Sequence, residues 1–459
     1  MNTIIFLAIS GIVVLGSGLF KLHKWLLAFS LIACLLAFIL NVSGWNLQGS
    51  YYNHMITIDP FAIKFTGLLI FESILVFLLC GFYYSNEIEH LADIYSLFIF
   101  SLIGGIVMVS YSNLVMFFIG LETLSIPLYV LAASHRTNVL SNEAGMKYFI
   151  FGSFQTCLLI LGIAFIFGTA NSFDMAVIAD FVRLHSGDLP ILFKVGVILL
   201  LCAFAFKVAA FPFHFWAPDV YQGAPTAVTA FMATVVKTAA MVSLLRLVMG
   251  IFSGIHEIWF NSLMVFSALT LIVGNITAIY QTSFKRLLAY SGISNAGYLL
   301  IAIVALNAKS ESVILYYSLV YSIATIASFS IFIAVKEQLG VDELENFKGT
   351  YVKNPLLTAA LTVSMLSLAG IPPVAGFFAK YYLFVNAWSA GFTWLVMIAI
   401  VTSIIGAFYY LRIIGFLYNR KEVVGSAIEI SMMYKVILYF SILTLLVLGL
   451  MPNLILKLI

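Results

Sequence analysis

Residues Leu200–Ala240 read LLCAFAFKVAAFPFHFWAPDVYQGAPTAVTAFMATVVKTAA, and this stretch decides how the rest of the chain is interpreted. Apolar runs on both sides of a proline-containing turn predict two membrane helices, the first of them broken near its end. Lys207 and His214 are seven residues apart, which predicts one shared helix face. Pro212 lies between them and removes a backbone hydrogen bond, which frees the carbonyl of Val208. Because charged groups are costly at membrane depth, this stretch is a candidate functional site.

The whole chain has the composition of a helical membrane protein. Of its 459 residues, 63% are hydrophobic and 9% are charged, and the mean hydropathy is +1.11. Runs of about 20 apolar residues without alternation indicate membrane helices rather than a barrel. The net charge of +3 comes with no basic patch that indicates nucleic acid, and no Rossmann glycine pattern or P-loop is present. The cysteines in the apolar segments are expected to be packed free thiols, not disulfides or metal ligands: Cys34, Cys80, Cys157 and Cys202.

Fourteen transmembrane helices are predicted, so the expected fold class is an all-α membrane protein. The first apolar run lacks a basic segment before it and is expected to be a retained helix, not a cleaved signal. None of the connecting loops is long enough for a soluble domain. The predicted spans cover residues 2–20, 24–42, 62–84, 93–110, 113–133, 146–169, 191–217, 223–250, 258–281, 285–306, 310–337, 355–384, 389–418 and 433–456.

Lysine and arginine residues in short loops predict the orientation in the membrane. The loops after odd-numbered spans contain Lys21, Lys24, Arg136, Lys285, Arg286, Lys336, Lys348, Lys353, Arg420 and Lys421. The opposite side has Lys64, Arg183, Lys194, Lys309 and Lys457. We therefore expect the odd-numbered loops to be cytoplasmic and both termini to lie on the non-cytoplasmic side. The acidic residues Glu87, Glu89 and Asp93 also face the cytoplasm in this arrangement, but acids count little in the rule.

Two proline-containing spans indicate an internal repeat. The seventh span contains FKVAAFPFHFWAPD and the twelfth contains LAGIPPVAGFFAKYYLF, each with prolines, small residues and a lysine nearby. Pro212 and Pro373 are five helices apart, and this odd spacing predicts opposite orientations in the membrane. Inverted repeats with broken helices are typical of transporters, whose ion sites lie at the breaks. The alternative is a pair of ordinary proline kinks.

Lys237 is the least ambiguous charged residue within a span. It lies about fourteen residues into its helix, and Thr226, Thr229 and Thr234 precede it by eleven, eight and three residues. These spacings predict one helical stripe of hydroxyl groups ending in the amine, which can hold ordered water. The alternative is that the threonines only fill space in the packing.

Other ionisable residues in the spans fall into two groups. Glu122, Lys207, Lys380 and Glu72 lie within apolar stretches, although Glu122 can also be a helix-end glutamate and Glu72 has no evident partner. Lys147 and Arg412 lie nearer span ends, where a long side chain can reach the surface. His214 is either a proton carrier or a hydrogen-bonded histidine beside the break. A buried lysine whose proton affinity changes as a glutamate approaches or retreats can load and release a proton, so the chemistry suits proton transfer.

Five motifs together resemble a known family. They are GLETLSIPLYVLAA with Glu122, EAGMKYFIFGSF with Lys147, KVAAFPFHFWAPDVYQGAPTAVTAFMATVVKTA, KRLLAYSGISNAGYLL, and GIPPVAGFFAKYYLF with Lys380. The chain is similar over nearly its whole length to the antiporter-like membrane subunits of proton-pumping NADH:quinone oxidoreductase (respiratory complex I), and its AKYYLF segment resembles the subunit N branch. It departs from the family at Asn295, where a histidine is usual, so the path through that position is in doubt or carried by water.

The resemblance implies an architecture and roles for the charged residues. It implies N-terminal helices 1–3 in residues 1–92, inverted five-helix repeats in residues 93–250 and 258–418, and a last helix in residues 433–459. It implies that Glu122 and Lys207 form an ion pair, that Lys237 is the central relay and that Lys380 is the exit-side lysine. It also implies an inner-membrane location among other complex I membrane subunits, with NADH, FMN, iron–sulfur clusters and quinone bound in partner subunits and no cofactor or metal here.

Three functions remain open at this point. The chain is a proton-translocating subunit of complex I, a subunit of a Na⁺/H⁺ antiporter or membrane-bound hydrogenase of the same superfamily, or a structural membrane subunit. The number of buried charges disfavours the last of these. Composition does not separate the first two, and co-purifying subunits would.

Overall fold

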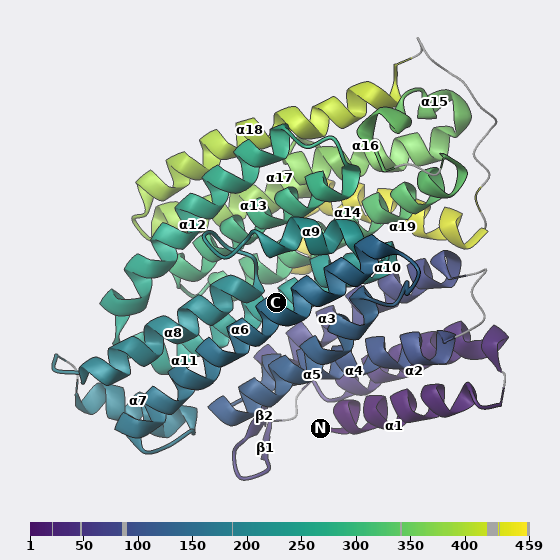
Figure 1. The fold of residues 1–459 in the computed structure, drawn as a ribbon. Helices are drawn as coiled ribbons and strands as arrows, with labels where there is room; N and C mark the ends of the chain where they lie inside the picture. Colours follow the sequence, from purple (N-terminus) through teal and green to yellow (C-terminus); the bar gives the residue numbers. More distant parts are fainter. Residues whose placement is uncertain are drawn as a thin grey trace.

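The computed structural model describes residues 1–20, 22–45, 48–84, 90–185, 187–339, 342–419, 430 and 432–456, and most of these residues are helical. The helices run side by side, with α1 and α2 along one side of the bundle and α18 along the other (Figure 1). The first half contains α1 (Asn2–Ser17), η1 (His23–Trp25), α2 (Leu26–Ser43), β1 (Gly49–Tyr51), β2 (Ile56–Ile58), α3 (Pro60–Tyr83), α4 (Leu91–Ser110), α5 (Leu114–Ala132), α6 (Val139–Ala170), α7 (Met175–Leu184), α8 (Ile191–Lys207), α9 (Trp216–Gly223), α10 (Thr226–Phe231), η2 (Met232–Val236), α11 (Lys237–Gly250) and η3 (Ile251–Gly254).

The second half contains α12 (His256–Ile279), α13 (Phe284–Ala305), α14 (Ser310–Leu339), η4 (Leu344–Phe347), α15 (Thr350–Lys353), α16 (Pro355–Ala369), α17 (Ala375–Ser389), α18 (Thr393–Leu417), α19 (Met432–Leu450) and α20 (Asn453–Leu456). Six charged residues used in the sequence analysis lie outside the described residues: Lys21, Glu87, Glu89, Arg420, Lys421 and Lys457.

The described helices have the lengths and composition of membrane spans. Ten of them are long and apolar enough to cross a membrane, and Asn2–Ser17, Pro355–Ala369 and Tyr434–Leu450 are shorter apolar helices. The seventh and twelfth predicted spans are each divided between two helices, α8 with α9 and α16 with α17. The chain is therefore a multi-pass helical membrane protein, and the count of fourteen spans stays a prediction.

Two details differ from the sequence expectations. The loop before α3 contains a two-stranded antiparallel hairpin, β1 with β2, so the described chain is nearly but not entirely α-helical. Cys34 and Cys80 are buried free thiols as expected, but Cys157 is exposed and Cys202 is half-buried. The packed-thiol prediction is wrong for Cys157, because an apolar membrane helix also presents apolar residues on its outer face.

The first helix break separates Lys207 from His214. Helix α8 ends at Lys207, and Ala209 then adopts a left-handed backbone conformation with φ of 56° before the cis peptide bond Phe211–Pro212. His214 lies in the turn that follows, before α9 begins. The prediction that Lys207 and His214 share a helix face is therefore wrong, because the helix ends before Pro212 rather than bending at it.

The second break has a glycine that the geometry requires. Helix α16 ends at Ala369, and Gly370 adopts φ of +81° while its N–H donates to the carbonyls of Leu366 and Ser367. Such a left-handed residue commonly ends a helix, and glycine adopts it without a steric cost. The cis peptide bond Pro372–Pro373 follows, and α17 begins at Ala375. The chain therefore turns beside Lys380 without continuing one helix.

Helix α3 connects the N-terminal helices to both later parts of the bundle. It packs against α2 and α4, against α10 and α11, and against α14 and α19. Between α10 and α11 the helix contains a π-helical turn, Met232–Val236, immediately before Lys237. Single π turns inside α-helices are frequent at functional sites.

Candidate functional site

Lys207 is buried where α8 ends, and it binds a hydroxyl group rather than a carboxylate. Its side chain is 4% exposed, and Nζ donates to Oγ of Ser125 on α5 at 2.6 Å. Glu122, one turn earlier on α5, is half-buried and its Oε1 accepts a hydrogen bond from Thr156 at 2.6 Å. Glu122 and Lys207 therefore make no direct ion pair, although the charge of Glu122 still acts on Lys207.

Lys237 is buried between α11 and α13. It is 5% exposed, and Nζ donates to the carbonyl oxygen of Gly292 at 2.6 Å. The threonine hydroxyls before it are used elsewhere: Thr234 donates to the carbonyl of Ala230 at 2.7 Å and Thr229 to that of Tyr221 at 3.0 Å. These two hydroxyls donate to backbone carbonyls of preceding residues and a π turn lies before Lys237, so the stripe of hydroxyls and amine stays a prediction.

Lys380 extends from α17 back to the second helix break. It is 7% exposed, and Nζ donates to the carbonyl of Ala369 at 2.9 Å and to Oγ of Ser403 at 3.0 Å. Ala369 is the last residue of α16, where carbonyls lack helical partners and the helix dipole favours a cation. The break thus supplies the oxygen that holds this amine.

These three lysines also each lie over a tyrosine ring. The distances from Nζ to the ring centroid are 5.7 Å from Lys207 to Tyr148, 5.5 Å from Lys237 to Tyr321 and 5.0 Å from Lys380 to Tyr298. A cation over a tyrosine face gains about 0.5–2 kcal/mol. Each of these amines therefore contacts a neutral oxygen and the face of a tyrosine ring. These partners stabilise the ammonium form, but they do not form an ion pair that would hold the amine in that form.

A small cavity lies between the surroundings of Lys237 and Lys380. Its volume is about 10 Å³, close to the space that one water molecule needs. Its lining includes Asn295, Tyr321, Ser367 and Lys380, and Oγ of Ser367 is buried without a hydrogen-bond partner. Because Tyr321 also lies under Lys237, the cavity adjoins residues that contact both amines.

Asn295, which replaces a histidine of the resembled family, is part of a polar network beside this cavity. Its Nδ2 donates to the carbonyl of Ser291 at 2.8 Å, and its Oδ1 accepts from the hydroxyl of Tyr317 at 2.5 Å. The hydroxyls of Ser291 and Tyr410 are hydrogen-bonded to each other. An amide cannot take the place of a titrating imidazole, but this network can orient water.

Lys147 belongs to a surface ionic cluster that joins α6, α9 and α13. Its Nζ lies 2.6 Å from Glu143 and 2.6 Å from Asp219, and Nη1 of Arg286 lies 2.7 Å from the other oxygen of Asp219. Burial by itself raises the pKa of Asp219, but the hydrogen bonds from Lys147 and Arg286 outweigh it and hold that pKa below the usual value. Lys147 thus differs from Lys207, Lys237 and Lys380, because it is held by two carboxylates.

Two other predicted residues have different surroundings. His214 is half-buried, its Nδ1 has no hydrogen-bond partner, and its ring stacks on Phe211 at 5.5 Å between centroids. Glu72 is completely buried on α3 and accepts hydrogen bonds from Thr238 and Ser322. The sequence offered no partner for Glu72, because these two residues lie far away in the chain.

Sequence reasoning missed Lys285, which it used only to predict orientation. Lys285 is 1% exposed, and Nζ donates to the carbonyls of Ala224 at 2.6 Å and Gln222 at 3.1 Å. These carbonyls end the short helix α9, so the amine caps that helix end. The only available signal was its place at the start of the KRLLAYSG motif.

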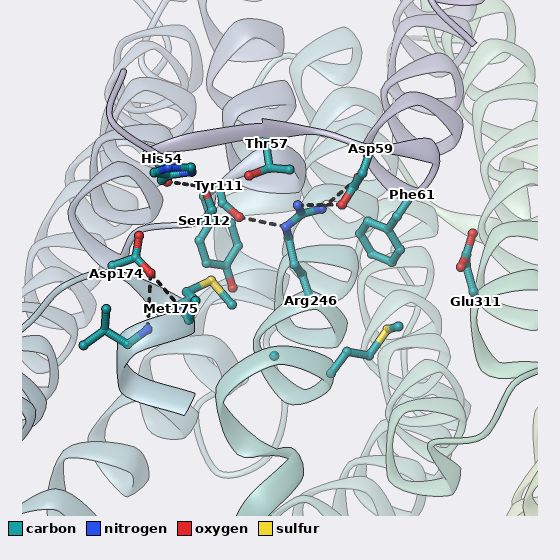
Figure 2. Close-up of a pocket in the computed structure, with 14 residues that line it drawn as sticks. His54, Thr57, Asp59, Phe61, Tyr111, Ser112, Asp174, Met175, Arg246 and Glu311 are labelled. Carbon is teal, nitrogen blue, oxygen red and sulfur yellow. Dashed lines mark hydrogen bonds and ion pairs between the residues drawn. The ribbon is translucent and has the colours of Figure 1, made fainter. Parts of the chain in front are cut away.

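Arg246 was also missed, and it lies at the other end of α11. It donates from Nη2 to Asp59 at 2.9 Å and from Nε to the carbonyl of Tyr111 at 2.7 Å (Figure 2). These groups line a pocket of about 640 Å³ together with His54, Asp174 and Glu311. Lys207, Lys237 and Lys380 do not line this pocket, and the contacts of Arg246 join α11 to the start of α3, so we assign Arg246 a structural role.

No cluster of histidine, cysteine, aspartate or glutamate among the described residues has the arrangement of a metal site. The candidate site therefore consists of Lys207, Lys237 and Lys380. Each of these amines donates a hydrogen bond to a neutral oxygen inside the bundle.

Comparisons with known proteins agree with one another. A family described as "NADH:quinone oxidoreductase/Mrp antiporter, TM" matches residues 111–406. NADH-quinone oxidoreductase subunit N of Flavobacterium johnsoniae is 40% identical over 465 residues, which cover 100% of both chains. A chain in the structure of respiratory complex I from Thermus thermophilus with bound aureothin is similar, with 30% identity, a TM-score of 0.83 and coverage of 99% of this chain and 98% of that one. A chain of the Mrp complex from a Dietzia species is also similar, with 20% identity, a TM-score of 0.85 and coverage of 100% of this chain and 95% of that one. At this identity, the similarity shows a shared fold only.

Proposed function

This chain belongs to the NADH:quinone oxidoreductase/Mrp antiporter family and is a membrane subunit of proton-pumping complex I, and we propose that its buried lysines carry the protons. Its partners are other membrane subunits of that complex, and the cofactors lie in other subunits. We propose that NADH, FMN, iron–sulfur clusters and quinone react there, so that this chain moves protons without electron transfer of its own.

The contacts of the lysines support this role. A charged ammonium loses much more than a neutral amine when it leaves water, and in this chain hydrogen bonds to neutral oxygens only partly offset that cost. A lysine held in this way changes between the two forms more readily than one paired with a carboxylate. The observation that carries the proposal is that Lys207, Lys237 and Lys380 are all buried and all bound by neutral oxygens.

We propose an order for these residues. A proton is first bound at Lys207, whose hydrogen-bond partner Ser125 lies one turn from Glu122 on α5. It passes to Lys237 and then to Lys380, on the exit side. The cavity bounded by Tyr321 and Lys380 supports the last of these transfers, because one ordered water there has polar partners in Asn295 and Ser367. Lys147 and His214 have secondary roles in this scheme, since Lys147 is tied to two carboxylates.

We also propose the finer topology. The chain would cross the inner (plasma) membrane fourteen times, with both termini on the non-cytoplasmic side and with inverted repeats in residues 93–250 and 258–418. Two similar breaks support this repeat: each has a residue in the left-handed conformation, Ala209 or Gly370, and a proline shortly after it, Pro212 or Pro373. Reporter fusions at the two ends of the chain test the orientation, and a cytoplasmic signal at either end contradicts it.

Substitution of Lys237 tests the proton-carrying role. Arginine keeps a charge and can still donate to the carbonyl of Gly292, but it does not release its proton. We expect Lys237→Arg and Lys237→Ala both to lose NADH-driven proton uptake in membrane vesicles, with assembly of the complex unchanged. Each charge moved across 100 mV costs about 2.3 kcal/mol, so a stalled relay should also slow coupled turnover. Parent-like pumping by Lys237→Arg, with failure only of Lys237→Ala, would identify a fixed counter-charge and refute the relay.

A further inference from the structure

Glu72 is a completely buried carboxyl group outside the two predicted repeats. It lies near the middle of α3 and is 0% exposed. The helices packed on α3 include α11, which follows the π turn, and α14. An acidic side chain at this depth in a membrane protein is costly and marks a candidate functional residue.

The two oxygens of Glu72 have different surroundings. Oε1 accepts hydrogen bonds from the hydroxyl of Thr238 on α11 at 2.9 Å and from that of Ser322 on α14 at 2.6 Å. Oε2 is buried and has no hydrogen-bond partner. Among the described residues, no lysine, arginine or histidine forms an ion pair with Glu72. This asymmetry fits a neutral acid, whose carbonyl oxygen accepts two hydrogen bonds while the other oxygen carries the proton.

Glu72 and Lys237 are connected through the same two helices. Thr238 directly follows Lys237, and Ser322 directly follows Tyr321, whose ring lies under the Lys237 amine. The charge of Glu72 also acts on Tyr321. Lys237 in turn makes no ion pair with a carboxylate among the described residues. Two buried titratable groups of opposite type, both without an ion-pair partner among the described residues, are thus held near the same tyrosine.

Two charged groups on the surrounding helices are paired with residues other than Glu72. Helix α10 and the π turn contain no titratable side chain. Arg246 on α11 is paired with Asp59, and Glu311 on α14 is paired with Lys64. Tyr95 on α4 interacts with Cys80, which lies on α3 about two turns after Glu72, so this tyrosine is next to a different part of α3. Tyr321 is the group on which the charge of Glu72 acts, and the Lys237 amine lies over the ring of that tyrosine.

We propose that Glu72 is the proton-exchange partner of Lys237. In one state Glu72 is a neutral acid and Lys237 a neutral amine; in the other, the O–H bond on Oε2 is broken, the proton is on Nζ, and a carboxylate faces an ammonium. One proton moves between the two groups, so their summed charge is zero in both states. This matters inside a membrane, where a single uncompensated charge is costly. The inference rests on the proposed role of Lys237 and extends it to α3.

Infrared spectroscopy of the intact complex in membranes tests the protonation directly. We expect a carbonyl band of a protonated carboxyl group that changes between resting and NADH-driven conditions and is absent in Glu72→Gln. Ser322→Ala removes one hydrogen bond to that carbonyl and should shift the band. Ser330→Ala is a matched control on α14, because its buried hydroxyl donates only to the carbonyl of Ile326, and it should leave the band unchanged.

Proton uptake gives a second and independent readout. We expect Glu72→Gln, which is isosteric but cannot titrate, to lose most NADH-driven proton uptake in assembled complex, and Glu72→Asp to recover part of it. Parent-like uptake in Glu72→Gln, or a band that does not change during turnover, overturns the proposal. The two proposals fail separately: parent-like pumping by Lys237→Arg removes the relay, whereas an NADH-driven change of the Glu72 band that persists in Lys237→Ala shows that Glu72 does not exchange its proton with Lys237.

Discussion

The substitution Gly292→Ala moves the amine of Lys237 without removing it. A methyl carbon built on Gly292 lies 2.9 Å from Nζ of Lys237 and 3.2 Å from the hydroxyl oxygen of Tyr321. Helix α13 itself tolerates the change, because alanine is a better helix former than glycine by about 1 kcal/mol. The strain therefore falls on the amine, which ends a flexible side chain and can move away.

The size of the effect follows from the contact distances. Ordinary contacts of this kind begin at 3.4 Å, so the amine must retreat by about 0.5 Å, the difference between 3.4 and 2.9 Å. Its hydrogen bond to the Gly292 carbonyl, now 2.6 Å, lengthens to about 3.1 Å, at the long end of the normal range. Hydrogen bonds of charged groups contribute about 1.5–3 kcal/mol. If the ammonium form of Lys237 loses about 1.4 kcal/mol of this stabilisation, its protonation equilibrium shifts about tenfold toward the neutral amine. We expect proton uptake to fall by a similar factor.

The assay is NADH-driven proton uptake by vesicles that contain equal amounts of assembled complex. Gly415→Ala is the matched control, because a methyl group on Gly415 meets nothing within 4 Å. If Gly292→Ala pumps as well as Gly415→Ala, the position of the Lys237 amine does not limit proton transfer, and the reasoning from its single carbonyl contact fails.

Two further outcomes follow from the second break and from the surface cluster. Gly370→Ala should destabilise the complex by about 1–3 kcal/mol, because φ is +81° and the new methyl group lies 2.8 Å from Cδ of Lys380; an unchanged thermal midpoint would contradict this. Asp219→Asn should keep proton uptake but lower stability by about 1 kcal/mol or less, since the cluster is partly exposed. Its pKa is lowered on folding, so its contribution is complete above the ordinary value of 3.8 and is lost as the pH falls through the folded value. If Asp219→Asn lost as much thermal stability as the parent on acidification through this pH range, Asp219 would not be the group responsible for that loss.

Several features of the fold follow from local sequence. The apolar runs give the membrane helices, and the prolines at 212 and 373 mark the two breaks, because a proline cannot continue a helix. The depth of Lys237 follows from the apolar run before it. The details at each break do not follow, since α8 ends five residues before Pro212, at a point that depends on packing against other helices.

The contacts of the candidate site depend on parts of the chain that local patterns do not connect. The ligands of Glu72 lie 166 and 250 residues away in sequence, and the acceptor for Lys237 lies 55 residues away. The threonines before Lys237 have the spacing of a stripe, but a hydroxyl in an apolar helix bonds the preceding turn when no other acceptor is near. The implied Glu122–Lys207 pair fails for a similar reason, because Ser125 and Thr156 offer hydrogen bonds first.

The buried lysines of the described chain differ in what holds their amines, and this difference favours Lys237 as the proposed relay. Lys285 and Lys380 donate to carbonyls at helix ends, which carry uncompensated partial negative charge and favour a cation by about 0.3–2 kcal/mol. Lys237 donates to Gly292, in the middle of α13, where the carbonyl belongs to the helix's own hydrogen-bond ladder. Its ammonium form therefore gains less from its surroundings. On this argument, the proposed relay gains and loses a proton most readily at Lys237.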